Sequence, residues 1–152
     1  MILGHRQRIW SAGMKIRSVA WVAVVALVVA VSARAASTPE DLAQAVAASW
    51  LRLTDAGNAD ASWDQAAMLF KGAVTKEMWA HALAGVRPPL GKVVTRKVSS
   101  RQYAEKMPGA PDGKYVIIQY VTVFEKKASA VETITSMLDP DNEWRVSGYF
   151  IR

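Results

Sequence analysis

The sequence predicts an α+β fold in which about three N-terminal helices pack on a curved, cone-like, four-stranded antiparallel meander sheet. The first observation is a change of period: apolar residues recur about every 3.6 positions before residue 91 and every second position after it. The second is that short connections rich in turn-forming residues join the later segments, which favours antiparallel neighbours. Helical and strand segments do not alternate, so a parallel α/β sheet is excluded.

The first helix is expected to begin at Thr38, with Pro39 at its first position and two acidic residues in its first turn. Gly57 is expected to end it. Its apolar face, at helical spacing, comprises Leu42, Ala45, Val46, Ser49, Trp50 and Leu53.

Two further helices are expected before the sheet. One follows Asp60 and ends at Gly72, with Trp63, Ala66, Ala67 and Phe70 on one side. The next begins at Thr75 and ends before Pro88, because proline cannot continue a helix without a lost hydrogen bond and a clash.

Four segments with period 2 follow, over residues 92–103, 114–125, 130–138 and 143–151. The loop 105–113 is rich in proline and glycine and is expected to close the first hairpin. Residues 139–142 suit a tight turn in which Asn142 adopts the left-handed conformation.

The composition fits one globular domain and excludes a disordered protein, since 51% of the 152 residues are hydrophobic and 21% are charged. A net charge of +6 commonly indicates a nucleic-acid or membrane partner. Residues 1–35, however, contain five basic residues and no acidic one, which leaves 14 basic and 13 acidic residues in 36–152. No nucleic-acid partner is therefore expected.

Residues 1–35 resemble a cleaved signal peptide. An apolar run over 19–33 follows a basic stretch, and the small residues Ala33 and Ala35 suit a signal peptidase. The run is shorter than the roughly 20 residues that span a bilayer. We expect cleavage after Ala35, export to the periplasm or the medium, and no stable membrane anchor afterwards; an uncleaved anchor is the alternative. Met14 makes a more typical start than Met1.

Several residue patterns then carry a family resemblance. They are Trp50-x-x-Leu53-x-Asp55-x-Gly57, Ser62-Trp63, Trp79, Arg87-Pro88-Pro89-Leu90-Gly91, Arg96, Pro108-Gly109-x-Pro111-x-Gly113, Glu132-Thr133 and Trp144-Arg145-Val146-x-Gly148-Tyr149. Residues 36–152 resemble the bacterial exported family called domain of unknown function 4019. That family has no established activity, so the resemblance implies no catalytic residue. The order of elements also resembles the nuclear transport factor 2-like and cystatin-like folds.

Few chemistries are available to residues 36–152. The chain contains no cysteine, which excludes a lipoprotein anchor and a disulfide framework. His81 is the one histidine of this region and lies outside any G-x-S-x-G or zinc pattern. Residues 139–143 begin like a calcium loop but lack its later ligands. We expect no metal, no cofactor and no catalytic residue, and a core role for Trp50, Trp63 and Trp79 rather than ligand stacking.

The arrangement with functional interest is a pair of charges inside apolar strand faces. Arg96 lies between Val94 and Val98, and Glu132 shares a face with Ile134. Symmetric hairpins would place Arg96 opposite Val121, and Val121 opposite Ile134. The same face would carry Gln119, Trp144, Val146 and Phe150, so the expected ligand-binding residues are Arg96, Gln119, Glu132 and Trp144. The alternative is a structural ion pair that joins the sheet to Arg87 or a helix end.

The other sheet face would carry Val116, Ile118, Tyr120, Val131 and Met137 among polar residues. Such a face needs a cover, and a second copy is the simplest one. We therefore expect a homodimer through Ile118, Tyr120, Val131 and Thr133.

Three functions remain open at this point. The first is a non-enzymatic module that binds a ligand or a protein. The second is an enzyme whose cone uses Asp55, Glu132, His81 or Tyr149 as acid or base. The third is an interaction domain without a pocket, in which Trp63, Trp79 and Phe70 fill the cone.

Overall fold

The computed structural model describes residues 36–152; the predicted signal peptide lies outside this range. The helices are α1 (Pro39–Asp55), α2 (Ala59–Asp64), α3 (Met68–Ala73) and α4 (Lys76–Leu90), and the strands are β1 (Val93–Ala104), β2 (Tyr115–Phe124), β3 (Lys127–Leu138) and β4 (Trp144–Ile151). The strands form one antiparallel sheet in the order β1-β2-β3-β4. The α+β class and the meander are therefore confirmed, with four helices in this range rather than three.

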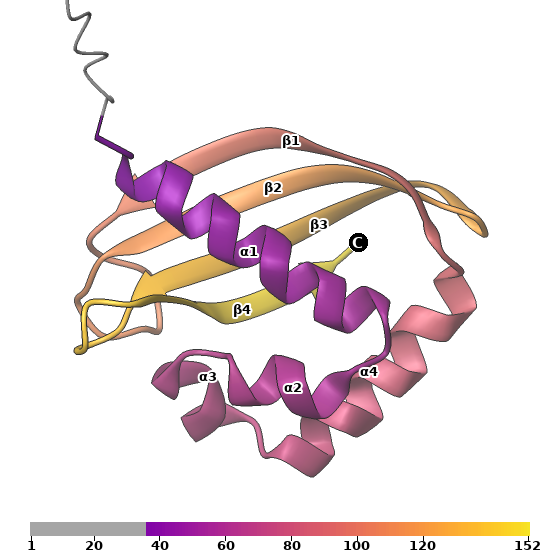
Figure 1. The fold of residues 1–152 in the computed structure, drawn as a ribbon, viewed down its shortest axis with the longest axis horizontal. Helices are drawn as coiled ribbons and strands as arrows, with labels where there is room; N and C mark the ends of the chain where they lie inside the picture. The colour runs from indigo at the N-terminus through magenta and orange to yellow at the C-terminus, as the bar shows by residue number, and fades with distance from the viewer. Residues whose placement is uncertain (1–35) are drawn as a thin grey trace, which may run out of the picture. The chain divides into compact units, whose positions relative to one another are not determined.

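Helix α1 crosses one face of the curved sheet, and α2, α3 and α4 lie together beside the β4 edge (Figure 1). Thr38 caps α1 through a capping box with Asp41. The buried face of α1 is Ala43, Ala47, Trp50, Leu51 and Thr54, whereas Leu42 is 47% exposed. The expected face is thus rotated, because the small side chains of Ala43 and Ala47 let the helix approach the sheet closely.

The second expected helix is divided into α2 and α3. The helix breaks at residues 65–67, where the backbone N–H of Ala67 donates to the carbonyl of Val146 in β4 at 2.8 Å. Ala66 and Ala67 are fully buried at this contact. The break therefore joins the helical layer to the last strand, a tertiary effect that apolar periodicity does not reveal.

Helix α4 continues through Pro88 and Pro89 to Leu90, so the expectation that it ends before Pro88 is wrong. Its end is set instead by Gly91, whose φ is 75° and ψ is −165°. Only glycine adopts this backbone conformation readily. Gly91 therefore sets the direction in which the chain enters β1.

Replacing Gly91 by alanine should lower the free energy of unfolding by about 1–3 kcal/mol. The added Cβ would also lie 2.9 Å from the Cβ of Glu125. Gly85→Ala in the same helix is the matched control, since no atom lies within 4 Å of its added Cβ, and it should raise stability by up to about 1 kcal/mol. Urea unfolding that gave both variants the same midpoint shift would contradict this account of Gly91.

Strand β2 presents to the helices the residues that we placed on the outer face. Val116, Ile118 and Tyr120 are all buried in the core. Gln119 lies on the outer face, where it accepts a hydrogen bond from the hydroxyl of Ser100 at 3.3 Å. The expected register is wrong as well, since Arg96 pairs with Thr122 rather than with Val121.

Strand β4 contains a bulge that the sequence does not predict. Trp144 pairs with Leu138 and faces the core as expected, but Ser147 is an extra residue in the ladder. A bulge of this kind reverses the sides to which later residues point. Phe150 is therefore 54% exposed on the outer face, and Tyr149 points to the helices.

The outer sheet face differs from the surface on which a homodimer is expected. Ile118 and Tyr120 are buried within one copy, so they cannot contact another. The exposed apolar residues of the outer face are Val121, Val131 and Phe150. A homodimer through the outer face stays a prediction.

The core lies between α1, the α2–α4 layer and the inner sheet face. Its centre is aromatic: the rings of Trp50 and Trp79 lie 5.5 Å apart, and Phe70 and Tyr149 pack edge-on against them. Two of these rings are tied by hydrogen bonds to Ser62, from Trp50 Nε1 to its carbonyl and from Trp79 Nε1 to its hydroxyl. The core role expected for Trp50 and Trp79 is confirmed.

Candidate functional site

Two arginines and two carboxylates meet where α1 and α4 end against the inner face of the sheet. Asp55 is the last residue of α1, Arg87 lies in the last turn of α4, and Arg96 and Glu132 belong to β1 and β3. Arg96 Nε donates to Glu132 Oε2 at 2.6 Å, and Arg96 Nη1 donates to Asp55 Oδ2 at 2.7 Å. The structure thus brings together Arg96 and Glu132, and joins both to the helix ends.

Glu132 is fully buried and has a complete set of donors. Its Oε1 accepts from Tyr149 Oη at 2.6 Å and from Arg96 Nη2 at 3.1 Å. Its Oε2 accepts from Arg96 Nε and from the hydroxyl of Thr122. A carboxylate has about four acceptor positions, so Glu132 has none left for a further partner.

Asp55 occupies a position where helix electrostatics disfavour a carboxylate, because the C-terminal end of a helix carries a partial negative charge. Arg96 compensates for it with two hydrogen bonds, one to each carboxylate oxygen. Arg87 adds a third through Nη2. About a quarter of the Asp55 side chain, 26%, remains exposed.

The cluster raises the pKa values of two of its members, Tyr149 and Arg96. Burial, together with the charge and hydrogen bond of Glu132, raises the pKa of Tyr149 far above that of an ordinary tyrosine. Burial disfavours the charged form of Arg96, but hydrogen bonds and charges from Asp55 and Glu132 outweigh this effect and raise the pKa of Arg96. Tyr149 is therefore a neutral donor and Arg96 a permanent cation at any physiological pH.

Arg87 is held differently from Arg96. Its side chain is 7% exposed, and its guanidinium carbon lies 4.7 Å from the centre of the Phe124 ring. Only Nη2 has a partner, Asp55; among residues 36–152 nothing accepts from the buried Nε and Nη1 groups. Buried donors usually have partners.

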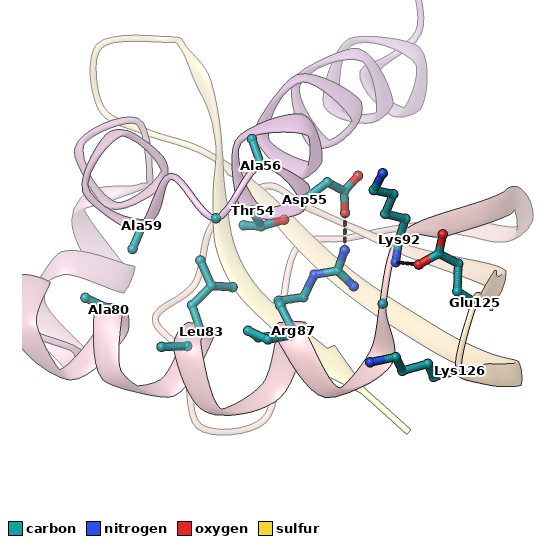
Figure 2. A pocket seen from close by; sticks show the side chains of 14 residues that line it. Thr54, Asp55, Ala56, Ala59, Ala80, Leu83, Arg87, Lys92, Glu125 and Lys126 are labelled. Carbon is teal, nitrogen blue, oxygen red and sulfur yellow. Dashed lines mark hydrogen bonds and ion pairs between the residues drawn. The ribbon is translucent and has the colours of Figure 1, made fainter.

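A cavity of about 450 Å³ lies beside Arg87 and Asp55 (Figure 2). Figure 2 shows Arg87 reaching from α4 toward Asp55, with Leu83 on one side and Lys92 and Lys126 on the other. The apolar part of its lining includes Ala59, Ala80, Leu83, Ala84 and Pro88. This volume lies within the usual range for small-molecule sites.

The four residues expected to bind a ligand are distributed over three places. Arg96 and Glu132 form the buried pair, and Gln119 faces the other side of the sheet. Trp144 packs in the core and also lines a second hollow, between α1 and β4. The 450 Å³ cavity is instead lined by Asp55 and Arg87. Ligand binding by the four expected residues stays a prediction.

Some members of the cluster were visible in the sequence and some were not. The sequence predicts Arg87 or a helix end as the structural partner of the Arg96–Glu132 pair, and Asp55 and Tyr149 as acid or base candidates. An acidic residue just before the stop at Gly57 was the available signal for Asp55. Thr122 was missed, because its place opposite Arg96 depends on the register.

Two other candidate sites are accounted for by local contacts. Arg145 binds Asp139 and Asp141, so the residues that mimic a calcium loop form a turn, in which Asn142 has the expected positive φ of 64°. No group of three metal-ligating His, Asp or Glu side chains occurs in residues 36–152. His81 is exposed on α4. None of the helices in the described range is long and apolar enough to cross a membrane.

The comparisons with known proteins identify a family. A search of curated proteins and a search of solved structures each found no match, so the likeness to nuclear transport factor 2-like folds stays a prediction. The family model described as "Protein of unknown function (DUF4019)" matches residues 46–149, a range that contains Asp55, Arg87, Arg96 and Glu132. Since the match spans well over half of the sequence, this chain belongs to the DUF4019 family.

Proposed function

We propose that this protein is an exported, non-enzymatic binding module whose small-molecule ligand occupies the cavity beside Asp55 and Arg87. The observation that supports it most is the cavity itself, about 450 Å³ in volume, which has apolar residues on one side, the Asp55–Arg87 pair, and charged residues at its rim. Small-molecule sites have this composition: mostly apolar lining with a few placed polar groups. The aromatic core fills the centre of the fold, but it leaves this end open.

The saturation of the carboxylates argues against catalysis. A general base needs a free lone pair within reach of the substrate proton, and the four positions of Glu132 are taken by Arg96, Thr122 and Tyr149. Tyr149, with its raised pKa, stays protonated and donates to Glu132. Asp55 already accepts three hydrogen bonds from two arginines. These groups serve to hold the helix ends against the sheet.

Export is proposed from the leader alone. The basic stretch, the apolar run over 19–33 and the small residues before position 36 together are typical of a signal peptide. Intact-mass analysis of the protein from its own host should give a chain that begins at Ala36. A chain that keeps residues 19–33 would contradict cleavage and favour the anchor.

A bulky side chain in the cavity should block the ligand. Ala84 lines the cavity from α4 and is exposed, so Ala84→Phe fills the space without disturbing the core. We expect fragments that bind the native protein in ligand-observed NMR to bind this variant about tenfold or more weakly. Ala82→Phe is the matched control, since Ala82 is exposed on the same helix and lines a different hollow.

A library of neutral and charged fragments should therefore give hits on native protein and on Ala82→Phe that disappear with Ala84→Phe. Native mass spectrometry of protein purified from its host should in addition show a retained small molecule. Hits that are equally strong with Ala84→Phe, or a complete absence of hits, would overturn the proposal.

A further inference from the structure

Resting on the proposed function, we infer that the ligand of this cavity is an organic carboxylate with a short aliphatic body, and that Arg87 binds its carboxylate group. The Arg87 side chain is more than nine-tenths buried, and its Nε and Nη1 have no acceptor among residues 36–152. Arg87 lines the cavity, and its two unpaired donors are covered in this conformation. A buried guanidinium with unpaired donors beside a cavity fits an anion.

Arg96 makes Arg87 available for this role. Asp55 accepts from Arg96 at both carboxylate oxygens, with distances of 2.7 and 2.9 Å, so it keeps two hydrogen bonds to a cation when the single bond from Arg87 is released. A rotation of the Arg87 side chain then exposes its covered N–H groups to the cavity.

The charge at the rim has the matching sign. Lys92 and Lys126 line the cavity, and neither forms an ion pair within the described residues. The one other rim carboxylate, Glu125, accepts from the backbone N–H of Lys92 at 2.9 Å. An incoming anion therefore meets two unpaired ammonium groups before it reaches Arg87.

The apolar part of the lining favours an organic anion over an inorganic one. The apolar surface of the lining stabilises a hydrocarbon body, whereas inorganic phosphate has no apolar part to place against it. This surface is formed by Leu83, Ala80, Ala84, Ala59 and Pro88. A compact monocarboxylate with several methylene groups satisfies both parts of the cavity.

Calorimetric titration of the protein with hexanoate, hexanamide and inorganic phosphate tests this inference. Hexanoate should bind at least about tenfold more tightly than hexanamide, because the amide lacks the charge that Arg87 recognises. Inorganic phosphate should bind more weakly than hexanoate. Equal affinities for hexanoate and hexanamide, or stronger binding of phosphate, would overturn the assignment.

Variants test whether Arg87 is the residue that recognises the carboxylate charge of hexanoate. Arg87→Gln should reduce hexanoate affinity about tenfold or more and leave hexanamide affinity nearly unchanged. Arg145→Gln is the control, since Arg145 binds Asp139 and Asp141 in the last hairpin turn. Lys92→Gln combined with Lys126→Gln leaves the core intact. This double variant should reduce hexanoate affinity severalfold at low salt and by a smaller factor at high salt.

The two proposals fail in different ways. If fragments bind and Ala84→Phe blocks them, but hexanoate and hexanamide bind alike, the carboxylate assignment is wrong and the binding module stands. If hexanoate binds equally to the native protein and to Ala84→Phe, its site is elsewhere and the carboxylate assignment to this cavity is wrong.

Discussion

Replacing Glu132 by alanine is expected to lower the free energy of unfolding by about 3–5 kcal/mol, because it removes the buried carboxylate that pairs with Arg96 and leaves this arginine with Asp55 alone. Glu132 is fully buried, and it accepts from Arg96, Thr122 and Tyr149. Without Glu132, two N–H groups of Arg96 and the hydroxyl groups of Thr122 and Tyr149 lose their acceptor. Urea unfolding monitored by tryptophan fluorescence measures the change.

Glu143→Ala is the control for this substitution, since Glu143 is exposed in the last turn. It should change stability by less than about 0.5 kcal/mol. The combined replacement of Arg96 by Met and Glu132 by Leu should recover only part of the loss: it removes the partly unpaired guanidinium, but the hydroxyls of Thr122 and Tyr149 stay without an acceptor. A loss below about 1 kcal/mol for Glu132→Ala would show that Glu132 is solvated and would contradict the described site.

Replacing Trp50 by alanine should have an effect of similar size, a loss of about 3–5 kcal/mol. Trp50 is 1% exposed and contacts Phe70, Trp79 and Tyr149 at the centre of the core. Its indole N–H also donates to the Ser62 carbonyl at 2.7 Å, which would be left without that donor. The change combines a large cavity with a lost buried hydrogen bond.

Thermal and urea unfolding of Trp50→Ala and Met68→Ala provide the comparison. Met68 lies on α3, in the α2–α4 layer, but is 69% exposed, so its truncation should cost under about 0.5 kcal/mol. The loss of stability for Trp50→Phe should lie between those of the other two variants, since it keeps an aromatic ring and removes the hydrogen bond. Similar losses for Trp50→Ala and Met68→Ala would contradict a core centred on Trp50.

The fold class follows from the sequence because each element carries its own local signal. Thr38 and Pro39 mark the start of α1, and the change of period near Gly91 marks the start of the sheet. The break at Ala67 has no local signal, because it depends on a hydrogen bond to Val146 in β4. Helix count therefore requires tertiary information that single-sequence periodicity lacks.

The register of the sheet differs from the one that the sequence predicts. The first hairpin closes so that Arg96 pairs with Thr122, and the second so that Thr122 pairs with Ala130. Each differs by an odd number of residues from the symmetric closure that we expected, and an odd shift reverses the face of the partner strand. Strand β2 therefore turns the opposite face to the helices from the one that we expected. Two odd shifts add to an even one between β1 and β3, so Arg96 and Glu132 lie on the same face, as expected.

The charged cluster was foreseeable in part for the same reason. Period 2 within β1 and β3 is a local property, and it places Arg96 and Glu132 correctly on their own strands. Tyr149 reaches Glu132 only because Ser147 is bulged, and bulges have no reliable sequence signal. The role of Arg87 depends on how two helix ends meet the sheet, which no single segment encodes.

The most direct test of the carboxylate site is the side-chain Nε–H signals of the arginines in a proton–nitrogen correlation spectrum, recorded during titration with hexanoate and assigned through Arg87→Lys and Arg96→Lys. Arg96 Nε already donates to Glu132, so its signal is an internal reference that should not move. The Arg87 Nε–H signal should shift downfield and exchange more slowly as its proton gains an acceptor. An Arg87 signal that stays in place at saturating hexanoate, or that shifts equally with hexanamide, would contradict the account.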